Sequence, residues 1–113
     1  MPDDCVFCRI VAGEIPADVV HETATVVAFR DLQPQAPLHV LVVPRDHTAD
    51  AAELADHHPD SVAELVKVAR DVATEAGHES YRLVLNTGAE AGQSVFHTHL
   101  HVLGGRPLTW PPG

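Results

Sequence analysis

The chain has 113 residues, of which 45% are hydrophobic and 20% charged, so it can form one domain with a real core. Its formal net charge of −9, without any segment rich in Lys and Arg, argues against a nucleic-acid partner. No stretch approaches the roughly 20 apolar residues of a membrane span. The acidic start at residues 1–4 is unlike a secretory signal, and two cysteines suit a reducing compartment. We therefore expect a single domain over residues 1–113, located in the cytoplasm.

The first half of the chain predicts a short helix followed by strands. Asp4 is a good N-cap and Gly13 a good residue to follow a helix, so a helix is expected between them. Apolar or alternating segments bounded by turn residues then predict strands over residues 19–22, 25–29 and 38–43. The first two of these strands are expected to form a hairpin.

The second half predicts one long helix and two further strands. Ser61 and Glu64 make a capping box, and apolar residues then recur at helical spacing up to Ala76. Strands are expected over residues 81–86 and 95–103, joined by a loop that contains glycine. Helices next to strands joined by hairpins predict an α+β domain with an antiparallel sheet.

Histidines alternate along the last expected strand. This alternation predicts His97, His99 and His101 on one face of the sheet, with same-face neighbours roughly 7 Å apart. Imidazole is a metal ligand, a proton carrier and a nucleophile, so the row is either a metal site or a catalytic row. A solvated polar face is the plain alternative. The preceding loop carries backbone N–H groups and short polar side chains that can hold a phosphate without Lys or Arg: Asn86, Gly92, Gln93 and Ser94.

The C-terminal residues resemble a known family. Gly92 to Arg106, which read GQSVFHTHLHVLGGR, are similar to the signature of the histidine-triad (HIT) superfamily, and the ending WPPG is similar to its Hint branch of purine nucleoside phosphoramidases. The resemblance runs from Phe7 to Gly113. It implies a HIT-like fold, with an antiparallel five-stranded sheet, one long helix, one short helix, and a sheet continued across a homodimer. Gly104 stands where the Fhit branch has Gln, which disfavours dinucleoside polyphosphate cleavage.

The resemblance also implies a reaction. The chain would hydrolyse nucleoside 5′-phosphoramidates, such as AMP–amine conjugates, through a covalent nucleotidyl-histidine. His99 would be the nucleophile, His101 would stabilise charge on the phosphate, and Ser94 would bind the phosphate or the leaving group. His39 would lie behind the triad and help to set protonation, although from the residues alone it is equally a buried core histidine.

The resemblance further implies a binding site for a purine nucleotide. Asp31 would accept hydrogen bonds from the ribose hydroxyls, and Asn86 would bond to the phosphate side of the ligand. The base would be enclosed by apolar side chains that, taken singly, are plain core residues: Phe7, Ile10, Ile15, Phe29 and Leu32.

Cys5 and Cys8 share one face of the first expected helix. Such a pair alone fits a redox couple, half of a zinc site, or two surface thiols. A structural zinc ion needs two more ligands, for which His47 and His97 are the candidates. The set resembles that of bacterial HIT proteins that bind one zinc ion through two Cys and two His, with no metal needed for the chemistry.

Two other functions stay open. His97, His99 and His101 could ligate a catalytic zinc ion that activates water, although alternating side chains on a flat strand converge poorly on one ion. The chain could also be a non-catalytic nucleotide-binding module, although binding alone does not need a nucleophile.

Overall fold

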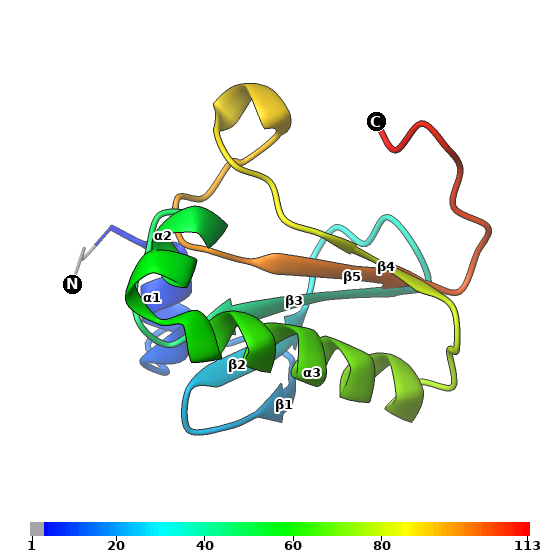
Figure 1. Ribbon diagram of the computed structural model, residues 1–113. Coiled ribbons are helices and arrows are strands. Elements are labelled where there is room, and N and C mark those ends of the chain that lie inside the picture. Colours follow the sequence, from blue (N-terminus) through cyan, green and yellow to red (C-terminus); the bar gives the residue numbers. More distant parts are fainter. Residues whose placement is uncertain (1–3) are drawn as a thin grey trace.

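The protein, represented by a computed structural model, is described over residues 4–113, so most of the acidic start lies outside the described residues. Its strands form one antiparallel sheet in the order β1-β2-β3-β5-β4 (Figure 1). The strands are β1 (Val19–Glu22), β2 (Val26–Arg30), β3 (Leu38–Pro44), β4 (Tyr81–Val84) and β5 (Leu100–Gly104). The predicted α+β class and five-stranded antiparallel sheet are confirmed.

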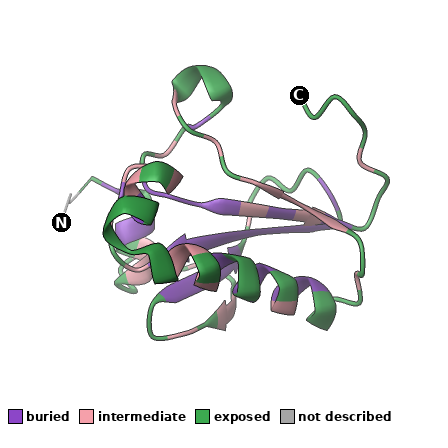
Figure 2. Ribbon diagram, viewed as in Figure 1, coloured by how far each residue is buried: buried purple, intermediate pink, exposed green. Residues whose placement is uncertain are grey.

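The long helix α3 (Pro59–Glu75) covers one face of the sheet (Figure 1). Its Leu65 and Val68 pack in the same buried cluster as Val40 of β3 and Val102 of β5. Each such side chain contributes about 1.5–3 kcal/mol when fully buried. Figure 2 shows the inner side of this helix and the central strands as buried, whereas the outer side of the helix is exposed.

The opposite face of the sheet carries the short helix α1 (Val6–Val11). Alternation along β3 sends Leu41 and Val43 to this side, where they form a second cluster with Phe7 and Phe29. β3 is therefore buried along its whole length. Since Leu41 pairs with His101 in the register of β3 and β5, this second face also receives the histidine row.

Helix boundaries differ from those predicted. A further helix, α2 (Ala51–His57), precedes α3 and is capped by Asp50, whose Oδ1 accepts the Glu53 N–H. α3 begins at Pro59, so the predicted capping box is wrong, because the helix is already under way at Ser61. In α1 the N-cap is Cys5, whose Sγ accepts the Cys8 N–H, in place of the expected Asp4. None of the helices in residues 4–113 has the length and hydropathy needed to cross a bilayer.

β5 also starts later than predicted, at Leu100 instead of Val95. The chain bends over residues 95–97, and Thr98 then donates its N–H to the Thr48 carbonyl at 2.8 Å. The hydroxyls of these two threonines lie 2.7 Å apart. Thr98 is thereby held against the loop before α2, and His97 leaves the regular alternation of the strand.

Candidate active site and metal cluster

Four side chains from three segments meet at the N-terminal end of α1. The Nδ1 atom of His97 lies 3.5 Å from the Sγ atoms of both Cys5 and Cys8, and 3.2 Å from the Nδ1 of His47. The Cys8 Sγ is 3.2 Å from the same His47 nitrogen. Ligands of a tetrahedral zinc ion lie about 3.3–3.8 Å from one another at usual bond lengths. The donor atoms therefore have the spacing of a Cys2His2 site.

The hydrogen bond behind His97 supports the same conclusion. Its Nε2 lies 2.9 Å from the carbonyl oxygen of Pro44, to which it can only donate, so Nδ1 holds a lone pair directed at the cluster. A metal-ligating histidine is commonly oriented by such a backbone carbonyl. Burial raises the pKa of the Cys8 thiol to about 11, an effect that the neighbouring Cys5 reinforces. A divalent cation would supply the missing positive charge and hold the thiols deprotonated.

His99 is fixed in one tautomer. Its Nδ1 lies 2.8 Å from the carbonyl oxygen of His97, so this nitrogen carries the proton and Nε2 keeps the lone pair. The ring packs edge-on against Phe7, with centroids 5.0 Å apart, and lies 5.1 Å from the ring of His101. His99 is only 7% exposed, yet it lines the cavity described below. The Nε2 of His99 therefore has the lone pair that a nucleophile requires, and the ring is positioned by Phe7 and His101.

His39 and His101 form a directional pair. The backbone N–H of Gln35 donates to the Nδ1 of His39 at 3.0 Å, so the proton of neutral His39 is on Nε2. That Nε2 lies 3.0 Å from the Nδ1 of His101 and 3.4 Å from Oδ2 of Asp31. His39 thus donates to His101, whose own proton must be on Nε2. The backbone of one loop decides the tautomer of both rings.

Burial keeps this pair neutral at physiological pH. It lowers the pKa of His101 to about 4, and His99 and His39 add to the effect while Asp31 opposes it. Burial also lowers the pKa of His39, again against the attraction of Asp31. Neutral rings preserve the donor–acceptor order, which protonation of either ring would break.

The same tautomers disfavour a second metal site. Ligand atoms of Asp31, His39 and His101 lie within 4.8 Å of one another, which is close enough for an ion. However, the Nε2 of neutral His39 holds a proton as long as its Nδ1 accepts from Gln35, so it has no lone pair for a metal. His97 and His101 also direct their Nδ1 atoms into separate clusters, so the row does not converge on one catalytic ion.

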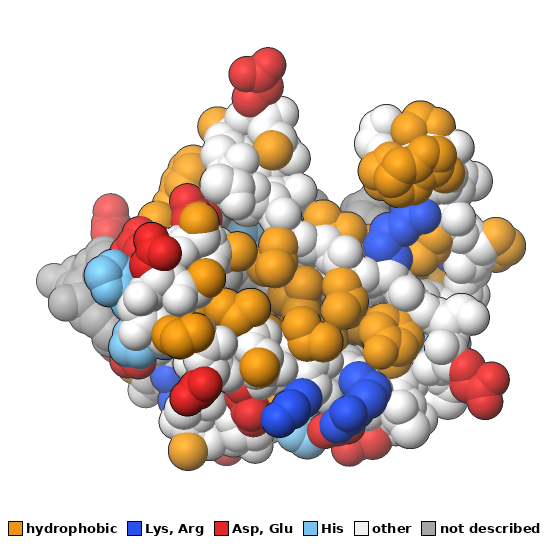
Figure 3. Space-filling view, viewed as in Figure 1, with side chains coloured by type: hydrophobic (Ala, Val, Ile, Leu, Met, Phe, Trp, Pro, Cys, Tyr) orange, Lys and Arg blue, Asp and Glu red, His pale blue; other side chains and the backbone are white. Residues whose placement is uncertain are grey.

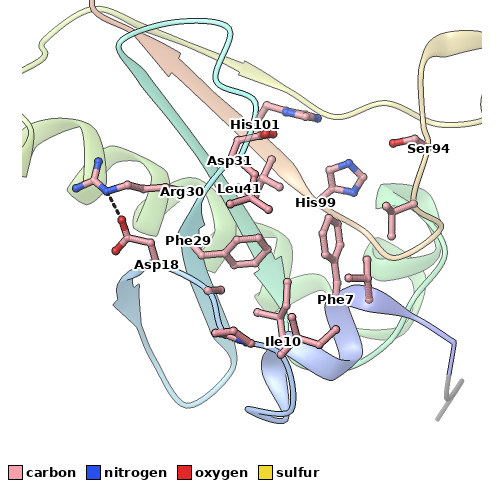
Figure 4. A pocket seen from close by; sticks show the side chains of 16 residues that line it. Phe7, Ile10, Asp18, Phe29, Arg30, Asp31, Leu41, Ser94, His99 and His101 are labelled. Carbon is pink, nitrogen blue, oxygen red and sulfur yellow. Dashed lines mark ion pairs between the residues drawn. The ribbon is translucent and has the colours of Figure 1, made fainter.

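A cavity of about 280 Å³ opens beside the histidines (Figure 4). His99, His101 and Asp31 line one end, and mainly apolar side chains line the other. The predicted base-binding residues all line it: Phe7, Ile10, Ile15, Phe29 and Leu32. Leu32 is 96% exposed and lies at its mouth. Leu41 also lines the cavity; it was not predicted, although alternation from His39 along the same strand places it on this face.

The loop before the histidines is only partly directed at the cavity. Ser94 is exposed, and its side chain lines the cavity (Figure 4). Gln93 is buried, with Oε1 accepting from the Gly88 N–H and Nε2 donating to the carbonyls of Ala49 and Val95. The Gln93 side chain therefore shapes the loop. Asn86 lies next to Gly92, whose φ of +103° favours glycine, and neither residue lines the cavity.

Comparison with known proteins agrees with this geometry. Residues 4–107 match the family model described as "Scavenger mRNA decapping enzyme C-term binding". The chain is 44% identical to a 14 kDa zinc-binding protein of Zea mays over 96% of this chain and 87% of the relative. It is 38% identical to the purine nucleoside phosphoramidase of Escherichia coli, over 96% and 92%.

A solved structure is also close. The crystal structure of a HIT family hydrolase from Legionella pneumophila matches with a TM-score of 0.92 and 46% identity, over 97% of this chain and 100% of that one. A family model that spans most of the chain, together with relatives of this similarity along nearly their whole length, shows that this protein belongs to the histidine-triad family.

Proposed function

We propose that this chain hydrolyses nucleoside 5′-phosphoramidates through a covalent nucleotide on His99. The observation that carries the proposal is the tautomer of His99, whose Nε2 lone pair is free while Nδ1 is bonded to the His97 carbonyl. The ring lines a cavity large enough for part of a nucleoside. We propose P–N bonds as the bonds cleaved because the Escherichia coli relative is named a purine nucleoside phosphoramidase.

The reaction would take place in two displacements. The Nε2 of His99 attacks the α-phosphorus, a P–N bond to histidine forms, and the P–N bond to the amine breaks with its electron pair leaving on the amine. The amine takes up a proton as it leaves. Water then attacks the phosphorus, gives up a proton, and returns the lone pair to His99 with release of the nucleoside monophosphate. The Nε2–H of His101 would donate to a phosphate oxygen as charge develops.

The binding roles follow from the cavity. The base would lie against Phe29 and Ile10, and the ribose hydroxyls would donate to Asp31, whose Oδ1 already accepts the Gln33 N–H at 2.8 Å. Ser94 would bind the phosphate or the departing amine. Asn86, Gly92 and Gln93 would act on the phosphate through the loop that they shape, because they lie outside the cavity lining.

We also propose that Cys5, Cys8, His47 and His97 hold one structural zinc ion. The ion would supply no step of the reaction; bound there, it ties α1, the end of β3 and the histidine segment together. This assignment rests on donor spacing and on the Pro44 bond, and it agrees with the name of the Zea mays relative.

A homodimer is the expected assembly of this single domain, residues 1–113. β4 is an edge strand, and Figure 3 shows an apolar area on the face that carries α3 and β4. Val66 of α3 and Leu85, which directly follows β4, are among the exposed large hydrophobic residues. Such a patch beside an open strand suits a second copy of the chain. Sedimentation of the purified protein tests this, and a monomer at micromolar concentration would refute it.

The decisive test is turnover of an AMP–amine conjugate labelled in the phosphate. Wild type should release AMP and, after a rapid acid quench, should carry label on protein. His99→Ala should lose about a thousandfold or more in kcat and should carry none. His57→Ala removes an exposed histidine of α2 and serves as the matched control. Near-normal turnover by His99→Ala would refute the mechanism, and tight nucleotide binding without turnover by wild type would favour the binding-module alternative.

A further inference from the structure

The loop that orients His39 belongs to neither a helix nor a strand. Residues 31–37 connect β2 to β3 and are braced by bonds within the loop. The Gln33 N–H donates to Asp31 at 2.8 Å, and the Gln35 Nε2 donates to the Gln33 carbonyl at 2.9 Å. These bonds order one end of the loop. The position of the Gln35 backbone, which determines the tautomer of His39, needs a further support.

That support comes from the residues after β5. The Nε of Arg106 donates to the carbonyl oxygen of Gln35 at 3.0 Å, and its Nη1 donates to the carbonyl of Pro107 at 3.0 Å. Gly105, at a φ of +90°, comes so close to Pro37 that a Cβ on it would lie 2.8 Å from the proline Cβ. The turn at Gly105 and Arg106 thus contacts the loop at two points. The proposed reaction assigns neither residue a role.

We propose that Arg106 is a positioning residue for the histidine row: by holding the Gln35 carbonyl, it keeps the Gln35 N–H on His39. The connection runs through contacts of 3.0 Å each, from Arg106 to Gln35, from Gln35 to His39, and from His39 to His101. Losing the first contact lets the Gln35 N–H leave the Nδ1 of His39. His39 can then hold its proton on either nitrogen, and His101 no longer has a fixed donor.

The chemistry of arginine suits this task. A planar guanidinium holds its N–H groups in a fixed fork, so Arg106 can bond to two carbonyls from different segments at once. Lysine has a single ammonium and can retain one of these bonds. Because Arg106 is exposed, the contact to Gln35 should be worth about a three- to tenfold change in rate, in the range of an ordinary hydrogen bond.

The first test needs no substrate. In uniformly ¹⁵N-labelled, zinc-loaded protein, long-range ¹H–¹⁵N spectra report which ring nitrogens carry protons, and a scalar coupling across the hydrogen bond links the Gln35 nitrogen to the His39 Nδ1. Wild type should show this coupling and a single Nε2–H tautomer of His39. Arg106→Ala should lose the coupling and show mixed tautomers, and Arg106→Lys should be intermediate. Arg70→Ala is the matched control, since it removes an exposed arginine of α3 that bonds to its neighbour Asp71.

The second test is kinetic and rests on the proposed function. Arg106→Ala should lower kcat for an AMP–amine conjugate about three- to tenfold with KM within about twofold, and Arg106→Lys should recover most of it. Arg70→Ala should match wild type. An unchanged coupling and tautomer in folded Arg106→Ala would overturn the proposal, as would a rise in KM alone. If Arg106→Ala does not fold, the spectra of wild type and Arg106→Lys are compared instead. Absence of the coupling in wild type, or an unchanged coupling and tautomer in Arg106→Lys, would overturn the proposal. An inactive wild type would refute the proposed function and leave the spectral test intact.

Discussion

The Nδ1–H of His99 donates to the carbonyl oxygen of His97 at 2.8 Å, and the ring of that same His97 belongs to the Cys2His2 cluster. His97 thus joins the proposed zinc site, through its side chain, to the proposed nucleophile His99, through its backbone carbonyl. This bond orients the His99 ring and leaves its Nε2 lone pair outside the proposed zinc ligands, which are Cys5, Cys8, His47 and His97. Experiments should therefore be able to separate the effect of the zinc ion on the fold from the role of His99 in the reaction.

Zinc removal should lower the thermal stability of the protein without abolishing turnover by the chain that stays folded. Wild type should contain about one zinc ion per chain, and Cys8→Ser should contain much less, because it loses a thiolate ligand. Chelated wild type should unfold at a lower temperature, as binding energy is lost from the native state. Atomic absorption measures the zinc content, and calorimetry measures the unfolding temperature. At a temperature where the chelated chain stays folded, prompt and complete loss of turnover that zinc restores would instead indicate a catalytic metal.

Replacing His39 should lower kcat and leave nucleotide binding nearly unchanged. His39→Leu removes the donor 3.0 Å from His101 and should cost about ten- to a hundredfold in kcat, the range expected when a buried polar group loses its hydrogen-bond partner. His39→Gln keeps an N–H that can reach His101 and should lose less. Steady-state kinetics on an AMP–amine conjugate separates kcat from KM. Equal losses in the two variants would mean that the donated proton is unimportant.

Stability should fall on mild acidification. The pKa of His101 is lowered to about 4 in the folded protein from an ordinary 6.5, so the unfolded chain takes up this proton first. The contribution of neutral His101 to the free energy of unfolding is complete above about pH 6.5 and is lost as the pH falls towards 4. Solvent screens this partly exposed ring, so the loss is on the order of 2 kcal/mol. Urea unfolding between pH 7.5 and 4.5 measures it. His101→Gln should show a shallower slope, and equal slopes would contradict the assignment.

Leu32 offers a test of the nucleotide cavity without disturbing the core. Its side chain is 96% exposed at the mouth, so Leu32→Ser should leave the melting temperature nearly unchanged. If Leu32 covers the bound base, KM should rise about three- to tenfold as apolar contact is lost. Val19→Ser, on β1 and outside the cavity lining, is a control for loss of an exposed apolar residue. An unchanged KM in Leu32→Ser would remove this residue from the binding site.

Alternation explains why much of the site was predictable from sequence. A period of two along β3 and β5 places Leu100 and Val102 under α3, and His101 and Leu41 on the opposite face, as the structure shows. The prediction failed where a tertiary contact outweighs local pattern. Thr98 bonds to Thr48, fifty positions away, and regular strand structure begins only at Leu100, after His97 and His99.

Backbone donors are the other part that sequence did not reveal. The Gln35 N–H determines the tautomer of His39, yet an amide looks the same at every position of a sequence. The position of Gln35 between Pro34 and Pro37 indicated only a turn. Likewise α2 escaped prediction, because one buried residue, Leu54, leaves little periodicity in a helix of seven residues. Caps and tautomers are decided by geometry that only the folded chain supplies.

Neighbouring residues of β3 face opposite sides of the sheet, with Val40 packed under α3, and His39 and Leu41 on the side that carries His101. A single inserted or deleted residue in this strand would exchange its two faces, putting an imidazole into the hydrophobic core under α3 and a valine on the side that carries the other histidines. Natural variation in chain length should therefore spare β3 and accumulate around α2 and the short turn at Ala89–Ala91, where exposed backbone can absorb it.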